Sequence, residues 1–247
     1  MDLRRSHAQR CSYTKLMPSK VSVVIPALNE AESIGSVLSS MPWDEIAECI
    51  VVDNGSTDTT AAIANANGAR VIQSPRGYGA AMRAGVNAVL PSTSIIVCMD
   101  GDGSDCIERM QDLVGPIERD EADFVIGSRI RGNAAPGSML PSQRIAAFLM
   151  GWLTKLVYGF RYTDMGPFRA IRRSSLEQLN MSELTYGWNL EMQLKAVTVG
   201  LRILEIPVNY KCRIGGESKV SGNVKASIQA ASRIIGVFLR VRAGAKS

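Results

Sequence analysis

The chain has 247 residues, of which 46% are hydrophobic and 21% are charged, a balance that excludes a globally disordered polymer. Its net charge of +5 favours anionic partners. Nucleic acid is not expected among them, because only 6% of the residues are aromatic and no arginine-rich arm is present. The single histidine, His7, leaves no histidine-ligated zinc site or histidine-based triad, and five scattered cysteines without a CxxC pair favour reduced thiols in the cytosol.

The first half of the chain alternates short apolar runs with helical patterns. The predicted strands are 21–25, 49–52, 70–72, 95–99 and 124–126, and the predicted helices are 30–40, 58–67 and 79–89. This alternation predicts an α/β fold with a mostly parallel sheet covered by helices on both faces. Ligands bind at the carboxyl ends of such strands, so we expect the loops 26–30, 53–58 and 100–104 to meet at one edge of the sheet.

The second half has longer helical patterns. The predicted elements are an amphipathic helix at 140–160, a strand at 168–171, a helix at 188–199, a strand at 203–210 and an amphipathic helix at 222–241. We expect a basic, disordered leader at 1–20, one domain at 21–221 and a C-terminal amphipathic helix within 222–247. The leader lacks the apolar core of a signal peptide, and the apolar stretch 145–160 contains Lys155 and is short for a membrane span.

The segment Asp100-Gly101-Asp102 carries the strongest chemical signal. Two carboxylates one residue apart at a strand end suit Mg²⁺ or Mn²⁺, which bind through one or two carboxylates together with substrate phosphates. Taken alone, the same residues also form ordinary turns.

Four further segments accompany it: Val24-Ile-Pro-Ala-Leu-Asn-Glu30, Val51-Val-Asp-Asn-Gly-Ser-Thr-Asp58, Thr163-Asp-Met-Gly-Pro-Phe-Arg169 and Arg213-Ile-Gly-Gly-Glu-Ser-Lys219. In this order the five motifs resemble the family 2 glycosyltransferases of the GT-A (Rossmann-like) fold. The last two are similar to the branch of polyprenyl-phosphate (dolichyl-phosphate) mannosyl- and glucosyltransferases. The resemblance covers about residues 21–233.

The resemblance implies a nucleotide-sugar pocket formed by Pro26, Leu28, Glu30, Val51, Asp53, Gly79, Asp100, Gly101 and Asp102. It also implies a metal site at Asp100, Asp102 and Ser104. Many family members have two acids where this chain has Asp53-Asn54, so only the first carries over. The glycines at 77 and 79 open a helix whose backbone N–H groups are candidates to face a phosphate, although a tight turn explains them equally well.

The catalytic residues implied by the resemblance are Asp102, Arg129, Asp164, Glu191, Arg213 and Lys219. The arginines and Lys219 are expected to contact phosphates, with a solvated surface position as the alternative. Asp164 and Glu191 are expected near the acceptor or the sugar, and either is alternatively a helix cap or a partner of Arg169.

The implied reaction is an inverting, metal-dependent transfer of a sugar from a nucleotide sugar, of the UDP-glucose or GDP-mannose type, to a polyprenyl phosphate. A first alternative is a soluble enzyme with a hydroxyl acceptor, which would need Asp164 or Glu191 as a base. A second is a sugar-nucleotide-binding protein or a nucleotidyltransferase. The segment 26–30 argues against the nucleotidyltransferase, because it stands where those enzymes have a glycine-rich basic loop.

The two amphipathic helices mix apolar faces with cations such as Lys155, Lys225, Arg233 and Arg240. Ordinary core packing explains this pattern, and so does contact with an anionic membrane surface. We therefore expect a cytoplasmic protein that is peripheral on the cytoplasmic face of a membrane, with a membrane-protein partner or a second copy of the chain as a further anchor.

Overall fold

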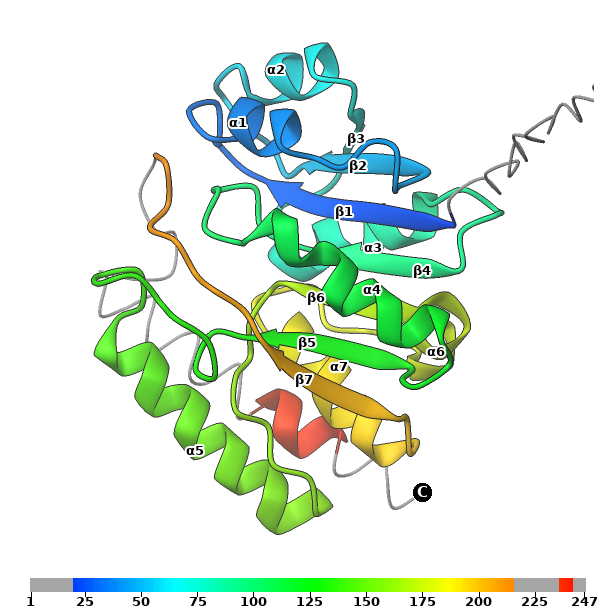
Figure 1. Cartoon of the computed structure of the whole chain (residues 1–247), viewed down its shortest axis with the longest axis vertical. Coiled ribbons are helices and arrows are strands. Elements are labelled where there is room, and N and C mark those ends of the chain that lie inside the picture. The colour runs from blue at the N-terminus through cyan, green and yellow to red at the C-terminus, as the bar shows by residue number, and fades with distance from the viewer. Residues whose placement is uncertain (1–19, 216–235, 242–247) are drawn as a thin grey trace, which may run out of the picture.

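The computed structural model describes residues 20–215 and 236–241 (Figure 1). Within them, one seven-stranded sheet has the order β3-β2-β1-β4-β6-β5-β7. Only β6 runs antiparallel to its neighbours, so the expected mostly parallel α/β fold is confirmed. The strands are β1 (Val21–Ala27), β2 (Glu48–Asp53), β3 (Arg70–Gln73), β4 (Ile95–Cys98), β5 (Phe124–Ser128), β6 (Arg169–Arg172) and β7 (Ile203–Pro207).

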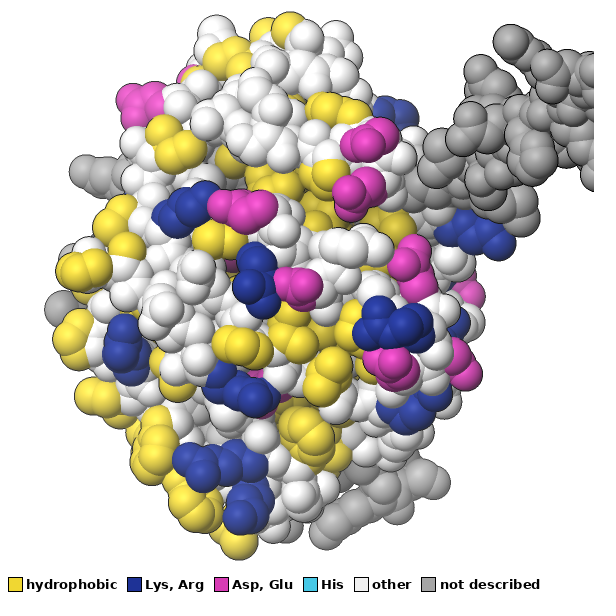
Figure 2. All heavy atoms as spheres, viewed as in Figure 1, with side chains coloured by type: hydrophobic (Ala, Val, Ile, Leu, Met, Phe, Trp, Pro, Cys, Tyr) yellow, Lys and Arg dark blue, Asp and Glu magenta, His cyan; other side chains and the backbone are white. Residues whose placement is uncertain are grey.

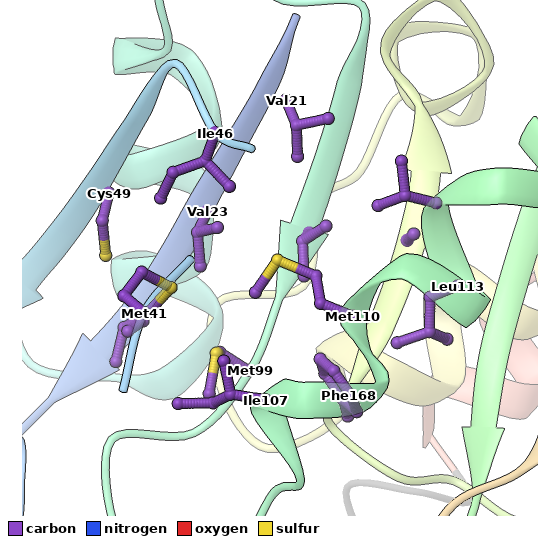
Figure 3. Close-up of a cluster of buried hydrophobic side chains, with 14 of the residues drawn as sticks. Val21, Val23, Met41, Ile46, Cys49, Met99, Ile107, Met110, Leu113 and Phe168 are labelled. Atoms are coloured by element: carbon purple, nitrogen blue, oxygen red, sulfur yellow. The ribbon is translucent and has the colours of Figure 1, made fainter. Parts of the chain in front are cut away.

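Helices cover both faces of the sheet, because the central strands are apolar on both sides. The helices are α1 (Ile34–Ser39), α2 (Thr60–Ala66), α3 (Tyr78–Ala88), α4 (Met110–Glu118), α5 (Pro141–Tyr158), α6 (Arg173–Leu179) and α7 (Trp188–Thr198), with a 3₁₀ turn η1 (Ile107–Arg109). On one face α1, α2 and α4 enclose a core that includes Met41, Met110 and Leu113 (Figure 3). On the other face α3, α6 and α7 enclose a second core around Met82 and Trp188.

The sequence patterns missed α4 and α6 and overestimated the lengths of other elements. Helix α4 contains Pro116, which argues against a helix interior, although its buried residues recur at helical spacing. Strand β7 ends at Pro207 rather than at residue 210, and α1 begins at Ile34 because residues 31–33 form a turn. The expected leader, except for its last residue Lys20, and most of the expected 222–241 helix lie outside the described residues.

The described part of that last helix is residues 236–241. Val237, Phe238 and Val241 pack against Leu190 and Leu194 of α7. The Phe238 ring also meets Tyr158 of α5 edge-on, with ring centroids 5.6 Å apart. The segment 236–241 therefore packs against both α7 and α5.

Helix α5 lies beside the sheet and does not cover it (Figure 1). Only Ala147, Gly151 and Thr154 of this helix are buried. Figure 2 shows hydrophobic side chains along the outer edge of the molecule where α5 lies. Among the described helices, neither α5 nor any other is long and apolar enough to cross a bilayer.

The strand directions bring the polar loops together as expected. The loops after β1, β2 and β4 all leave the carboxyl ends of neighbouring parallel strands. Asn54 N–H donates to the Ala27 carbonyl at 2.8 Å, and Ser33 Oγ donates to the Gly101 carbonyl at 2.9 Å. The three loops therefore form one connected rim, and the antiparallel β6 adds the loop that precedes it.

Candidate functional site

The loop after β4 gathers three acids in six residues. Asp102 is buried; its Oδ1 accepts hydrogen bonds from Ser104 N at 2.9 Å and from Ser104 Oγ at 2.5 Å. The buried Asp105 accepts a hydrogen bond from Asp100 N–H at 3.0 Å. Gly103 has φ +78°, a backbone conformation that favours glycine, so this residue allows the tight turn.

The carboxylates in this loop repel one another when they are ionised. Burial raises the pKa of Asp100 well above its ordinary value, and the charges of Asp105 and Asp102 raise it further. Burial also raises the pKa of Asp105 to about 7, against the hydrogen bond from Asp100 N–H. The loop therefore holds carboxyl groups that resist ionising together, and a bound cation would favour their ionised forms.

The donor set fits a hard divalent cation. Asp100, Asp102 and Ser104 offer carboxylate and hydroxyl oxygens, the ligand types that Mg²⁺ and Mn²⁺ prefer. Among the residues that the structure describes, no group of three or more His, Cys, Asp or Glu side chains is placed to hold a metal alone. Such an ion would need further ligands, for which the phosphates of a substrate are suited.

Arg213 lies against the same loop. Its Nη2 donates to Asp102 Oδ2 at 2.6 Å, while its Nη1 is buried and has no hydrogen-bond partner within the described residues. Ile214 N–H donates to the Asp102 carbonyl at 3.0 Å, and the Ile214 side chain occupies the space that a Cβ on Gly103 would take. The segment after β7 thus covers the loop 100–105, called the metal loop below. Lys219 lies outside the described residues.

Arg129, just after β5, is held by Asp164. Its Nε and Nη2 donate to the two Asp164 oxygens at 2.8 and 2.9 Å, and its backbone N–H donates to Oδ2 at 2.9 Å. Met165 N–H adds a fourth hydrogen bond, to Oδ1. The guanidinium also lies over the Tyr210 ring, 4.9 Å from its centroid. Both oxygens of the buried Asp164 are engaged, which favours a role in orienting Arg129 over the role as a base that a hydroxyl acceptor would require.

The nucleotide side of the rim is formed by the loops after β1 and β2. Asp53 accepts hydrogen bonds from Ser56 N–H and from Gln73 Nε2, each at 2.8 Å. Burial alone would raise the pKa of Asp53, but these hydrogen bonds outweigh it and lower the pKa, so this side chain is ionised at neutral pH. Glu30 is also buried, and its Oε2 accepts a hydrogen bond from Ser33 Oγ at 3.1 Å. Pro26 and Leu28 are half-buried at the end of β1.

Two expected site residues, Val51 and Gly79, have other surroundings in the structure. The Val51 side chain is fully buried in the core on the face covered by α1. Gly79 N–H donates to the Thr185 carbonyl at 3.2 Å, so it is not free to face a phosphate. A Cβ on Gly79 would lie 2.4 Å from the Glu183 carbonyl oxygen, so close packing of two loops is a sufficient reason for this glycine. Gly101 does lie in the metal loop, and its carbonyl accepts the hydrogen bond from Ser33.

Glu191 of α7 anchors the loop after α6. It accepts hydrogen bonds from Ser182 Oγ at 2.6 Å and from Glu183 N–H at 2.8 Å, and it pairs with Lys195 at 2.9 Å. Burial would raise its pKa, but the hydrogen bonds from Ser182 and Glu183 lower it. The carboxylate is therefore engaged in holding a loop.

Sequence reasoning missed four polar residues at the rim. Asp105 had a local signal, as a third acid close behind Asp100 and Asp102. Tyr78 Oη lies 3.5 Å from Asp100 Oδ1. Gln73 and Tyr78 lie well before the loop after β4 in the sequence and Tyr210 lies well after it, so no motif at that loop could have identified them.

Comparisons with known proteins identify the family of the chain. Residues 22–179 match the model for the family described as Glycosyl transferase family 2. A glycosyltransferase of Mycobacterium tuberculosis is 38% identical over 210 residues, covering 84% of this chain and 93% of that protein. A dolichyl-phosphate hexose transferase of Haloferax volcanii is 35% identical over 209 residues, covering 81% and 86%. An undecaprenyl-phosphate mannosyltransferase of Micrococcus luteus is 28% identical, covering 83% and 89%.

A solved structure shares the fold. Glucosyl-3-phosphoglycerate synthase from Mycobacterium tuberculosis, in complex with Mn²⁺, UDP and glucosyl-3-phosphoglycerate, has a TM-score of 0.69 and 21% identity, covering 91% of this chain and 80% of that chain. At this identity the likeness shows the GT-A fold alone. The family match spans more than half of the chain and includes the loops that form the rim, so the chain belongs to glycosyl transferase family 2.

Proposed function

We propose that this glycosyltransferase transfers a hexose from a nucleotide sugar to a polyprenyl phosphate, with inversion and with Mg²⁺ or Mn²⁺. The names of two relatives, the dolichyl-phosphate hexose transferase and the undecaprenyl-phosphate mannosyltransferase, support this substrate class. The observation that carries the proposal is the Arg129–Asp164 pair, because one of the two acids that a hydroxyl-acceptor enzyme would need as a base instead holds the Arg129 guanidinium at the rim.

On the donor side, the residues present suit a nucleoside diphosphate. Asp100, Asp102 and Ser104 would hold the metal, which would neutralise the charge that develops on the departing diphosphate. Arg213 Nη1 is buried and has no hydrogen-bond partner among the described residues, and a phosphate oxygen would satisfy it. Arg213 thereby supplies a fixed positive charge at the leaving group.

On the acceptor side, a phosphate monoester needs little help from a base. Its second pKa is about 6, so it is largely a dianion at neutral pH. One of its oxygens attacks the anomeric carbon, the bond from that carbon to the diphosphate breaks, and the configuration inverts. Arg129 is oriented by Asp164 and is suited to bind the acceptor phosphate.

Helix α5 offers a surface for the lipid. Its exposed apolar side chains are Ile145, Phe148, Leu149, Trp152, Leu153 and Leu156. The Arg161 guanidinium lies 4.6 Å from the Trp152 ring centroid, and Lys155 Nζ lies 5.3 Å from it. Aromatic and aliphatic side chains bordered by cations are typical of helices at an anionic bilayer surface. We include in the proposal that the enzyme works as a peripheral protein on the cytoplasmic face of a membrane; a second copy covering α5 is the alternative.

A transfer assay tests the proposal. The purified chain is incubated with Mn²⁺, a radiolabelled nucleotide sugar and a polyprenyl phosphate in detergent, and the label is measured after extraction into organic solvent. UDP-glucose and GDP-mannose are tried in parallel. Metal-dependent label in the organic phase is expected. Label found only on water-soluble hydroxyl acceptors would replace the proposal with the hydroxyl-acceptor enzyme, and nucleotide binding without transfer would indicate a binding protein.

A further inference from the structure

A cavity lies near the amino end of β4, on the face of the sheet that α3, α6 and α7 cover. Its volume is about 350 Å³, within the range of small-molecule sites, which is about 300–1,000 Å³. Ile96 and Leu176 line it and are buried in the core on that face. Arg173 also lines it and donates to the carbonyls of Leu90 and Pro91, shortly before β4. The rim is at the carboxyl end of β4, so the cavity is a separate place in the molecule.

Trp188 of α7 lines the cavity and has an unused hydrogen-bond donor. The residue is 1% exposed, and its indole Nε1 is buried with no hydrogen-bond partner within the described part of the chain. The indole nitrogen can only donate a hydrogen bond, and buried indole N–H groups usually have a partner. A buried donor without an acceptor costs free energy, which an oxygen of a bound molecule would recover.

The mouth of the cavity is polar. Arg83 and Asn87 of α3 and Asn180 after α6 line it and are exposed. No described residue forms an ion pair or a hydrogen bond with the side chain of any of these three. Arg173 and Glu177 also line the cavity, and they pair with each other at 2.9 Å. The mouth therefore offers two amide groups and one guanidinium, that of Arg83, which is available to an anion.

We propose that this cavity binds a small phosphorylated polyol, such as a hexose phosphate. The phosphate is largely a dianion at neutral pH and pairs with Arg83, because a guanidinium and a phosphate form two parallel hydrogen bonds. Hydroxyl groups of the ligand bond to Asn87 and Asn180, whose amides both donate and accept. A ligand oxygen accepts the hydrogen bond from the Trp188 indole. The cavity lies away from the rim, so this inference does not depend on the proposed function.

A cavity that holds only water leads to a different expectation. Water would then accept the hydrogen bond from Trp188, and Arg83 would be an ordinary solvated arginine. No small anion would bind in the cavity, and the loss of Arg83 would change only the net charge. The two cases are distinguished by measuring whether binding of a phosphorylated sugar depends on Arg83.

Calorimetric titration of the full chain with glucose 6-phosphate, inorganic phosphate and glucose provides this measurement. We expect saturable binding of glucose 6-phosphate that Arg83→Ala weakens about tenfold or more, because a charge-assisted hydrogen bond is lost. Glucose and inorganic phosphate should each bind more weakly than glucose 6-phosphate. Arg144→Ala, at an exposed arginine of α5, is the matched control and should keep the wild-type affinity. Arg213→Ala should also keep it, because Arg213 belongs to the rim.

Tryptophan fluorescence tests whether the ligand lies beside Trp188. The chain has three tryptophans, so Trp43→Phe combined with Trp152→Phe leaves Trp188 as the only one. Glucose 6-phosphate should change the emission of this variant, with the affinity that calorimetry gives for the wild-type chain. Adding Arg83→Ala should move the titration to concentrations about tenfold higher or more.

Several results would overturn the proposal. These are no saturable binding of glucose 6-phosphate at millimolar concentration, binding that Arg83→Ala leaves unchanged, and an unchanged emission of Trp188. Binding that is lost in Arg213→Ala would place the ligand at the rim and would also overturn it. If inorganic phosphate binds as tightly as glucose 6-phosphate, the assignment of a polyol is wrong. Thermal unfolding verifies that each variant is folded.

Discussion

Arg213 Nη2 lies 2.6 Å from Asp102 Oδ2, joining the segment after β7 to the loop after β4 across 111 residues of sequence. The Asp102 side chain is almost fully buried and the Arg213 side chain is one-third exposed. A carboxylate suited to a metal and a guanidinium suited to a phosphate are therefore held in contact. Binding of a metal and a diphosphate would change the partners of both groups. Asp102 would then bind the metal cation, and Arg213 would bind a phosphate of the diphosphate.

Replacing Arg213 tests the value of this contact. We expect Arg213→Ala to lower kcat about a hundredfold, because one fixed charge at a developing anion contributes about 3 kcal/mol in the transition state. Lys211→Ala is the matched control, since Lys211 is exposed and pairs with Glu108 on the surface. Steady-state kinetics of both variants provide the measurement. An Arg213→Ala enzyme with wild-type kcat would show that this arginine is an ordinary surface contact.

Asp164→Asn tests whether Asp164 orients Arg129 or acts as a base. The substitution leaves the largely buried Arg129 without its counter-charge, so we expect the free energy of unfolding to fall by about 3 kcal/mol. The KM for the acceptor should rise, while the pH profile of kcat should keep its shape. Adding Arg129→Met to Asp164→Asn should cost less than the sum of the single changes, because no unpaired charge then remains. Loss of the acidic limb of the pH profile in Asp164→Asn would identify Asp164 as the base.

Helix α5 is expected to bind anionic bilayers. Leu156 is 83% exposed, and Leu156→Glu would place a charge in the apolar face. We expect the wild-type chain to sediment with anionic liposomes at low salt and to be released by high salt, because each near-surface cation adds about 1 kcal/mol that salt weakens. Leu156→Glu should lower the bound fraction without changing nucleotide affinity. Leu204→Glu, at an exposed leucine of β7, is the control. If wild type and Leu156→Glu sediment equally with the liposomes, the apolar face of α5 does not bind the bilayer.

Acid stability should depend on the Asp123–Arg202 pair. Hydrogen bonds from Arg202 lower the pKa of Asp123 from 3.8 to about 2, against the effect of its burial. A folded-state pKa below the unfolded-state value stabilises the protein above about pH 4, and this stabilisation is lost as the pH falls toward 2. Asp123→Asn should therefore lose less of its unfolding free energy between pH 5 and pH 2 than the wild-type chain does. Urea unfolding between pH 5 and pH 2 provides the measurement, with the exposed Asp44→Asn as control. If the free energy of unfolding falls with pH equally for Asp123→Asn and the wild-type chain, the prediction is wrong.

The sequence predicts most of the central strands and the rim, because apolar strands buried on both faces and polar strand ends are local signals. It fails at α4, where Pro116 breaks the helical pattern, and at the contacts that only tertiary packing creates. Arg129 and Asp164 are 35 residues apart, and Asp53 and Gln73 are 20 residues apart, so their roles follow from pairings that no motif records. The opposite case is a residue that a motif points to but whose contacts in the structure lie elsewhere. Val51 packs in the core, whereas Gly79 and Glu191 contact the loop after α6.

Transfer of sugar to a polyprenyl phosphate by the wild-type chain and by Asp102→Asn tests the central claim most directly. Both are supplied with Mn²⁺, radiolabelled nucleotide sugar and polyprenyl phosphate in detergent, with Asp44→Asn as the matched control. The account predicts label in the organic phase for the wild type and for Asp44→Asn, abolished by EDTA, and a rate lowered about a hundredfold or more for Asp102→Asn. Unchanged transfer by Asp102→Asn in excess EDTA, or label that never enters the organic phase, would contradict it.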